Sequence, residues 1–211
     1  MAFQGWPVEA VEFYEGLEAD NSRTYWLAHK STYDDAVYAP MAALLADLEK
    51  EFGTGKIFRP NRDIRFSADK SPYKTAIAAS LDSGGYVQFS AHGLGAGNGM
   101  YMMAPDQLDR YRQAVADDVT GEALAKVIAE VEGHHIDVTG HDTLKTAPRG
   151  YPRDHPRVDL LRQKGLIAWQ QWPVKGWLGT PAAKTRIVDF LRASKPLHDW
   201  LVQHVGPGTH G

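Results

Sequence analysis

The chain has 211 residues, 23 Lys and Arg, 26 Asp and Glu, no Cys and a formal net charge of −3. This length suits one compact domain that folds without a staple, and the missing cysteines exclude thiol catalysis, disulfides and cysteine-ligated metal centres. The first residues carry no basic region followed by an apolar run, and no apolar stretch approaches the roughly 20 residues of a membrane span. We therefore expect a cytoplasmic protein without membrane contact.

The N-terminal quarter shows helical periodicity. Apolar residues recur at helical spacing in 8–17, 22–37 and 40–52, which predicts three amphipathic helices. Residues 20–22 offer a stop and an N-cap between the first two, and Gly53 ends the third. The second helix is expected to carry four residues on one face: Trp26, Lys30, Tyr33 and Val37.

The middle of the chain changes to short β-rich runs separated by turn residues. We expect strands at 57–58, 64–66, 75–81, 86–90 and 100–103. Residues 82–85 are a hairpin turn candidate. Residues 92–99 hold four glycines in eight positions, which favours a mobile lid or hairpin loop over a strand.

Helical signals return in the last half. We expect helices at 105–115, 122–131, 181–191 and 197–205, a loop-rich stretch over 133–157 with a short helix after it, and a last strand at 166–172. Strands clustered between helices predict an α+β fold with a mainly antiparallel sheet. The whole chain, 1–211, is expected to be a single domain with a core at about 3–205 and a frayed tail at 206–211.

The most informative segment is RDIRFSADKSPYKT, residues 62–75. Residues 56–75 carry six Lys and Arg against two acids, a local charge of +4 in an otherwise acidic chain. Long cations interleaved with apolar residues indicate a segment that lines a site for negative charge. If 62–66 is extended, Asp63 and Arg65 share a face, where they can pair or jointly contact a ligand. Ile64 and Phe66 then face the core.

The turn that follows directs the next strand. Asp69 is suited to hydrogen-bond its own backbone within 67–72. Beyond the turn, Lys74 leads a row of three small residues on one face: Ala76, Ala78 and Ser80. Such a row permits close helix packing or leaves room for a ligand beside the ammonium group.

A second basic segment has a similar composition. Residues 145–164 carry six Lys and Arg against two acids, again a local charge of +4. The sequence Pro-Arg-Gly-Tyr-Pro at 148–152 predicts a turn that holds Arg149 and Tyr151 outward. We expect Lys145, Arg149 and Lys164 to form the other wall of a cleft.

These patterns predict a cleft for a small phosphate- or carboxylate-bearing ligand. Ten residues are expected to line it: Arg62, Asp63, Arg65, Asp69, Lys70, Tyr73, Lys74, Lys145, Arg149 and Tyr151. If the protein is an enzyme, metal-independent phosphoryl or acyl chemistry fits best, with Lys74 or Tyr73 as the acid–base group. No cofactor and no metal are expected.

Three alternatives remain open at this point. The charges can form a structural ion-pair network that holds an irregular loop together. The segment can belong to a module that binds nucleotides or nucleic-acid ends, although the negative net charge argues against coating of nucleic acid. The chain can also be a non-catalytic interaction domain for an acidic partner. The sequence does not indicate an oligomeric state.

Two further sequence patterns are weaker evidence for a functional site. His134, His135, Asp137, His141 and Asp142 cluster in the sequence, but their spacing matches no helical His pair or zincin pattern, so we interpret them as loop residues. The glycines of 93–99 lack the helix and acidic residue that complete a dinucleotide-binding fingerprint.

The chain also resembles the bacterial and fungal domain-of-unknown-function 2461 family. The features that carry the resemblance are Asn21, Trp26, Lys30 and Tyr33, the run RDIRFSADKSPYKT, Tyr86, LKTAPRGYPRDHP and the closing PLHDWL. They extend from about Phe3 to Leu201, and the basic run is the most specific. Asp20-Asn21 stands where the family pattern has Asn-Asn, which still permits capping. The resemblance implies a single α+β domain and no particular activity or catalytic residue.

Overall fold

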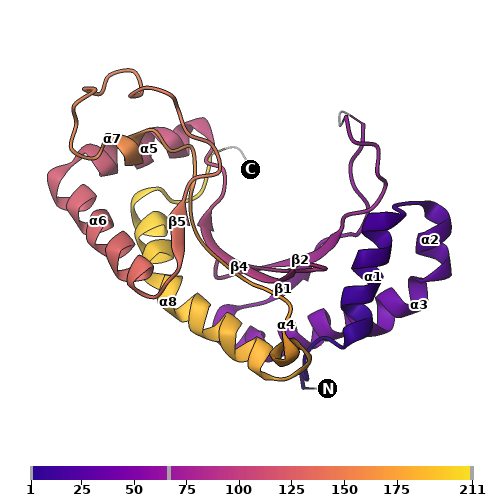
Figure 1. Cartoon of the computed structure of the whole chain (residues 1–211). Coiled ribbons are helices and arrows are strands. Elements are labelled where there is room, and N and C mark those ends of the chain that lie inside the picture. The colour runs from indigo at the N-terminus through magenta and orange to yellow at the C-terminus, as the bar shows by residue number, and fades with distance from the viewer. Residues whose placement is uncertain (1, 66–67, 210–211) are drawn as a thin grey trace. The chain divides into compact units, whose positions relative to one another are not determined.

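The structure is a computed structural model that describes residues 2–65 and 68–209 (Figure 1). Its strands form one antiparallel sheet in the order β1-β2-β3-β4-β6-β5. Helices precede and follow the strand-rich middle of the chain, so the α+β prediction is confirmed. The strands are β1 (Gly55–Ile57), β2 (Ala76–Leu81), β3 (Gly85–Ser90), β4 (Gly93–Met100), β5 (Asp137–Thr139) and β6 (Leu166–Trp172).

The chain divides into two compact units. The first contains the residues up to Ala96 together with Gln171–Asp189, and the second contains Gly97–Gln170 and the residues from Phe190 onward. Strands β4 and β6 and the last helix each run from one unit into the other. The single-domain assignment stays a prediction. Within the described residues, no helix combines the length and apolar character needed to span a bilayer.

The N-terminal helices of the first unit follow the predicted stretches, with one interruption. The helices are α1 (Val8–Ala19), α2 (Arg23–Ala28), α3 (Lys30–Thr32), the π-helix η1 (Tyr33–Tyr38) and α4 (Ala39–Phe52). The Ser22 side chain caps α2 by accepting from Tyr25 N, and Gly53, with φ +80°, ends α4. Where one continuous helix is predicted, His29 and the π-turn break the regular spacing.

This interruption changes which residues share a face. Trp26, Tyr33 and Val37 are buried as predicted. Lys30 is not on that face. It is exposed, and its Nζ lies 2.5 Å from Asp34 Oδ2, because a wider helical turn after residue 32 rotates the following side chains relative to it.

Strands β2 and β3 form the predicted hairpin, and their alternation creates two different faces. Ile77, Ala79, Val87 and Phe89 are buried on the core face, where Trp6 stacks on Phe89 at 4.9 Å. Leu45 of α4 lies against Gly55 of β1 on this side. The alternate residues of β2 and β3 form the other face, which we call the open face, and the candidate site lies there.

The glycine-rich stretch is a strand, not the predicted loop. β4 covers residues 93–100 and is largely buried. A Cβ at Gly93 would lie 2.1 Å from Trp172 O, and one at Gly99 would lie 2.5 Å from Leu166 O. The glycines therefore allow the β6 backbone to approach closely, at φ angles of +116° and +126° that favour glycine. The predicted strand at 100–103 is wrong beyond Met100, where β4 ends.

The second unit supplies the remaining helices. They are α5 (Pro105–Ala116), α6 (Asp118–Gly133) and α7 (Val158–Leu161). Two further helices lie later in the chain: the short 3-10 helix η2 (Gly176–Gly179) belongs to the first unit, and α8 (Ala182–His204) has residues in both units. β6 has the predicted bounds, whereas β5 lies inside the stretch predicted to be loop. β5 has three residues, too few to produce a recognisable alternation.

The last helix does not break where two helices are predicted. Pro196 lies inside α8, although proline removes a helical hydrogen bond. Leu191, Leu197 and Leu201 continue one buried face across it, and this packing outweighs the missing bond. Beyond α8, residues 206–209 are hydrogen-bonded to α5 through Gln107, Arg110 and Asp106, where the sequence predicts a frayed tail; 210–211 lie outside the described residues.

Candidate functional site

Residues 59–65 and 68–75, which lie between β1 and β2, form a narrow arm with two antiparallel limbs (Figure 1). Lys74 N donates to Pro60 O at 2.8 Å, and Arg62 N donates to Pro72 O at 2.9 Å. The pairing ends there, with an isolated bridge between Asn61 and Tyr73. The strand predicted at 64–66 is therefore wrong for Ile64 and Arg65, because no strand among the described residues pairs with them. Phe66 lies outside the described residues.

The base of the arm is anchored to α2 and to the residue before its cap. Asn21 Nδ2 donates to Tyr73 O at 3.0 Å, and Tyr73 N donates to Asn21 Oδ1 at 3.1 Å. The Tyr73 ring, 7% exposed, stacks on Trp26 at 4.4 Å with an interplanar angle of 9°. Phe13 and Tyr33 complete this aromatic cluster. The arm therefore leaves the core at a fixed position.

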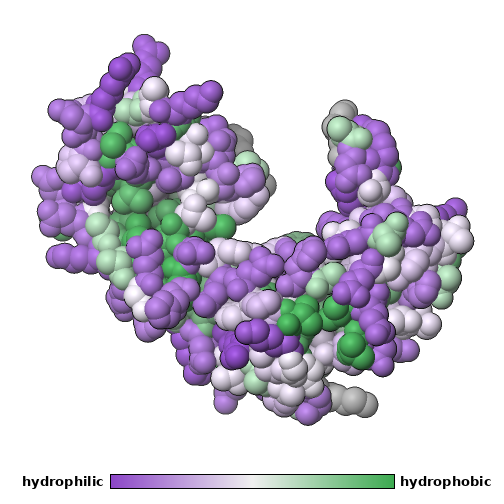
Figure 2. Space-filling model, viewed as in Figure 1, coloured by the Kyte–Doolittle hydropathy of each residue, from purple (hydrophilic) through white to green (hydrophobic). Residues whose placement is uncertain are grey.

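The tip of the arm holds internal ion pairs. Arg65 binds Asp63 in a bidentate manner, with Nε–Oδ1 and Nη2–Oδ2 distances of 2.9 and 2.7 Å. Pairing was one of the two arrangements that the sequence left open for these side chains, although they lie in a loop and not in the expected strand. Arg62 pairs with Asp69, and Lys70 Nζ donates to Ile64 O at 3.0 Å. The visible surface of the arm is largely hydrophilic (Figure 2).

Local hydrogen bonds fix the charge of both tip carboxylates. Hydrogen bonds from Ser71 hold the pKa of Asp69 well below its usual range, and Arg62 adds to this effect. Ser71 N donates to Asp69 Oδ1 at 2.9 Å, which is the backbone turn predicted for Asp69. The Arg65 side chain lowers the pKa of Asp63 in the same way. At neutral pH these carboxylates are ionised and already occupied by protein donors.

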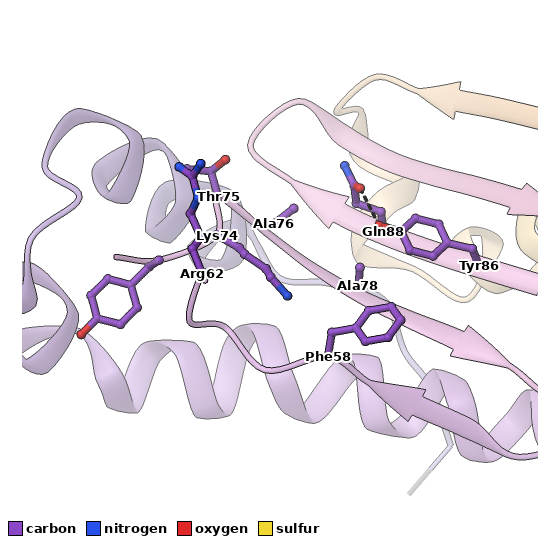
Figure 3. Close-up of a pocket in the computed structure, with 9 residues that line it drawn as sticks. Phe58, Arg62, Lys74, Thr75, Ala76, Ala78, Tyr86 and Gln88 are labelled. Atoms are coloured by element: carbon purple, nitrogen blue, oxygen red, sulfur yellow. Dashed lines mark hydrogen bonds between the residues drawn. The ribbon is translucent and has the colours of Figure 1, made fainter. Parts of the chain in front are cut away.

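At the base of the arm, a hollow of about 340 Å³ opens on the open face of the sheet (Figure 3). It is lined by Phe58, Arg62, Tyr73, Lys74, Thr75, Ala76, Ala78, Tyr86 and Gln88. Three of the ten predicted residues are among them: Arg62, Tyr73 and Lys74. Lys74, Ala76 and Ala78, the start of the predicted row of small residues, line this hollow. No helix of the described residues packs against the row there.

Lys74 is the distinctive cation of the hollow. Its Nζ lies 5.7 Å from the centroid of the Phe58 ring, within the range of a cation–π contact. In the described part of the chain, Arg62 and Arg65 each have an aspartate partner, whereas Lys74 pairs with no carboxylate. No carboxylate of the described residues therefore neutralises its positive charge.

Sequence reasoning missed the far wall of the hollow. Ala78 pairs with Gln88, and Ser80 with Tyr86, across β2 and β3. Phe58 N donates to Ala78 O at 2.9 Å, which places Phe58 in the same cross-strand row. The two-residue spacing of Tyr86 and Gln88 puts them on one face of a strand, and this spacing was the only signal in the sequence that linked them.

The second basic segment lies in the other unit, and three of its cations hold that unit together. Arg157, whose side chain is 10% exposed, donates to Val115 O at 2.7 Å and Ala116 O at 3.1 Å at the end of α5. Arg162 Nε donates to Leu144 O at 2.6 Å, and Lys164 pairs with Asp142 at 2.6 Å. These contacts are structural.

The remaining predicted residues of that segment are more accessible. Lys145 and Arg149 are exposed. Tyr151 N donates to Pro148 O at 3.2 Å, and Gly150 has φ +90°, so the predicted turn is confirmed. Partial burial raises the pKa of the Tyr151 phenol. The two basic segments belong to different units, so the expectation that they line one cleft stays a prediction.

The histidine-rich stretch takes part in a local contact. The Tyr101 hydroxyl and His141 Nδ1 are 2.6 Å apart, and the two rings stack at 4.2 Å. Among the described residues, no group of three His, Asp or Glu side chains is arranged to hold a metal ion.

Comparison with known proteins identifies the family. A family described as "Conserved hypothetical protein (DUF2461)" matches residues 9–200. The chain belongs to this family, and the match covers the arm, the hollow and both basic segments. No curated protein and no solved structure matches the chain.

Proposed function

We propose that this protein binds a small anionic ligand, carrying a phosphate or carboxylate group, in the hollow at the base of the arm. The observation that carries the proposal is the position of Lys74. Its ammonium group lines a hollow, lies over an aromatic ring and pairs with no carboxylate in the described part of the chain. An ammonium group in this setting attracts an anion.

Arg62 is the second donor in this proposal. It lines the same hollow and pairs with Asp69, whose carboxylate also accepts from Ser71 N. Asp69 therefore orients the guanidinium rather than removing it from the site, and a fork of five N–H donors retains positions for an anion. Asp63, Arg65 and Lys70 are paired at the tip, and we assign them to the shape of the arm.

Tyr73 has a positioning role in this account. Its ring is buried against Trp26, so Lys74 is the acid–base candidate that remains if the ligand undergoes a reaction. The lack of cysteine supports a cytoplasmic location in this proposal.

Binding of simple anions to the full-length chain tests the proposal. The ¹⁵N-labelled protein is titrated with inorganic phosphate and with acetate, and shifts of the Lys74, Thr75 and Ala76 amides report binding. Losing a hydrogen bond to a charged group costs roughly 1.5–3 kcal/mol, so Lys74→Ala should weaken binding about 10- to 100-fold. Arg62→Ala should weaken it less.

The matched control is Lys50→Ala, which removes the same charge from an exposed position near the end of α4. It should bind like the wild type. Equal affinity of the wild type and Lys74→Ala would refute the proposal.

The second basic segment has its own test. If Arg149 reaches the same ligand, Arg149→Ala and Lys74→Ala will show coupled effects on affinity in a double-mutant cycle. If Arg149→Ala binds phosphate like the wild type, the site belongs to the first unit alone.

A further inference from the structure

The hollow has an aromatic wall beside its cations. Phe58 is 37% exposed, and its ring centroid lies 6.4 Å from that of Tyr86, with a tilt of 33°. Both rings line the hollow that contains Lys74 (Figure 3). We propose that the ligand carries a planar aromatic or heteroaromatic ring next to its anionic group, an inference that rests on the proposed function and specifies its ligand.

The floor between the rings is shaped for a flat group. Ala76 and Ala78 contribute only methyl groups on the open face of β2. Phe58 and Tyr86 stand on the same side of the sheet as Ala78 (Figure 3). We expect a planar ring over these methyl groups to contact both aromatic side chains, since aromatic rings prefer centroid separations of about 4.5–7 Å.

The Tyr86 ring is held in place before any ligand arrives. Its hydroxyl donates to Gln88 Oε1 at 2.9 Å, and the two residues are two positions apart on the same face of β3. Both side chains belong to β3, the middle of the β2-β3-β4 group of strands. A wall that is already oriented reduces the entropy lost when a ligand binds.

The dimensions restrict the ligand to a small molecule. The volume of about 340 Å³ is near the lower end of ligand pockets, which begin at roughly 300 Å³. The Lys74 ammonium and the Phe58 centroid are 5.7 Å apart, so the anionic group must lie close to the ring. A molecule with one ring and one acidic group fits both the volume and the short separation, whereas a dinucleotide or an oligonucleotide is too large for the volume.

Two matched pairs of compounds test this inference on the full-length chain. Phenyl phosphate and cyclohexyl phosphate have the same charge and similar size, but only the first has a flat ring. Benzoate and cyclohexanecarboxylate make the same comparison for a carboxylate. We expect the aromatic member of at least one pair to bind about two- to tenfold more tightly, the gain expected from an aromatic contact. The pair that shows the preference identifies the acidic group.

Three variants locate the preference. Phe58→Leu and Tyr86→Leu should bring the aromatic-to-cyclohexyl affinity ratio close to one. Ala78→Leu should fill the floor and weaken the binding of both ring compounds while inorganic phosphate still binds. The control is Tyr38→Leu, which replaces an exposed aromatic residue outside the hollow and should leave the ratio unchanged.

The outcomes separate this inference from the function on which it rests. A wild-type ratio near one in both pairs, or a ratio that survives both leucine variants of the aromatic wall, would overturn the planar-ring inference and leave anion binding intact. If Lys74→Ala binds inorganic phosphate and acetate like the wild type, the anion site and the inference fail together.

Discussion

The Asn21 side chain and the Tyr73 backbone exchange two hydrogen bonds, of 3.0 and 3.1 Å, across 52 residues of sequence. This contact joins the start of the N-terminal helices to the returning limb of the arm. Lys74 is the next residue, so the contact fixes the backbone from which the proposed anion donor extends. The position of Lys74 therefore depends on a residue that does not line the hollow.

We predict that Asn21→Ala will both destabilise the protein and weaken anion binding. Losing the contact should lower the free energy of unfolding by about 1–2 kcal/mol, measured by urea denaturation, and reduce phosphate affinity several-fold. Ser22→Ala is the control, because losing the N-cap of α2 costs about 1 kcal/mol but leaves the Tyr73 contact. If both variants bind phosphate equally well, Asn21 has no role in positioning Lys74.

Tyr73→Phe should have little effect on either property. The variant keeps the ring that stacks on Trp26 and removes only the hydroxyl. Phosphate affinity is expected to stay within about twofold of the wild type, a difference below 0.5 kcal/mol. Tyr73→Ala, in contrast, should unfold at a lower denaturant concentration, because it leaves a cavity beside Trp26. A large loss of affinity in Tyr73→Phe would restore the hydroxyl as a ligand contact.

A third prediction concerns the glycine strand. Gly99→Ala places a Cβ at 2.5 Å from Leu166 O on a backbone with φ +126°, which should reduce the free energy of unfolding by about 2 kcal/mol or more. Gly133→Ala serves as the comparison, since a Cβ there meets nothing within 4 Å. Thermal unfolding of Gly133→Ala should show a neutral or slightly stabilising change. Equal stability of the two variants would show that β4 and β6 do not approach as described.

Acid should release the C-terminal residues from α5. The hydrogen bond from Thr209 N, helped by Arg110, lowers the pKa of Asp106 to about 2. Because this pKa lies below the value of about 3.9 in an unfolded chain, the contact stabilises the folded state above pH 4 and is lost as the pH falls toward 2. NMR titration of the Asp106 carboxyl and the Thr209 amide measures this change. A midpoint near 4 would mean that the contact does not form in solution.

Periodicity predicted the elements that depend on local pattern. The α1 and α4 helices, the β2–β3 hairpin and β6 follow from apolar spacing and turn residues. The row from Lys74 to Ala78 was visible as well, because side chains two apart on a strand share a face. The contact between Asp63 and Arg65 at the tip is also local, because the two residues are two positions apart in the sequence.

The failures come from contacts between distant segments. β4 was predicted to be a loop because four glycines in eight positions are typical of flexible or tightly turning segments. Only the approach of β6 explains why glycine is required at residues 93 and 99. The Asn21–Tyr73 contact and the Phe58–Tyr86 wall depend on pairing that no local pattern encodes. Lys164 was expected in the wall of a cleft, whereas it pairs with Asp142 of its own unit, and Arg157 and Arg162 of the same basic segment donate to backbone carbonyls.

The most direct test of the central claim is a crystal structure of the full-length protein grown with phenyl phosphate. We predict electron density for the phosphate with an oxygen about 2.7–2.9 Å from Lys74 Nζ and for the phenyl ring over Ala76 and Ala78. Phosphate density at another site, with the hollow beside Lys74 filled only by water, would contradict the account.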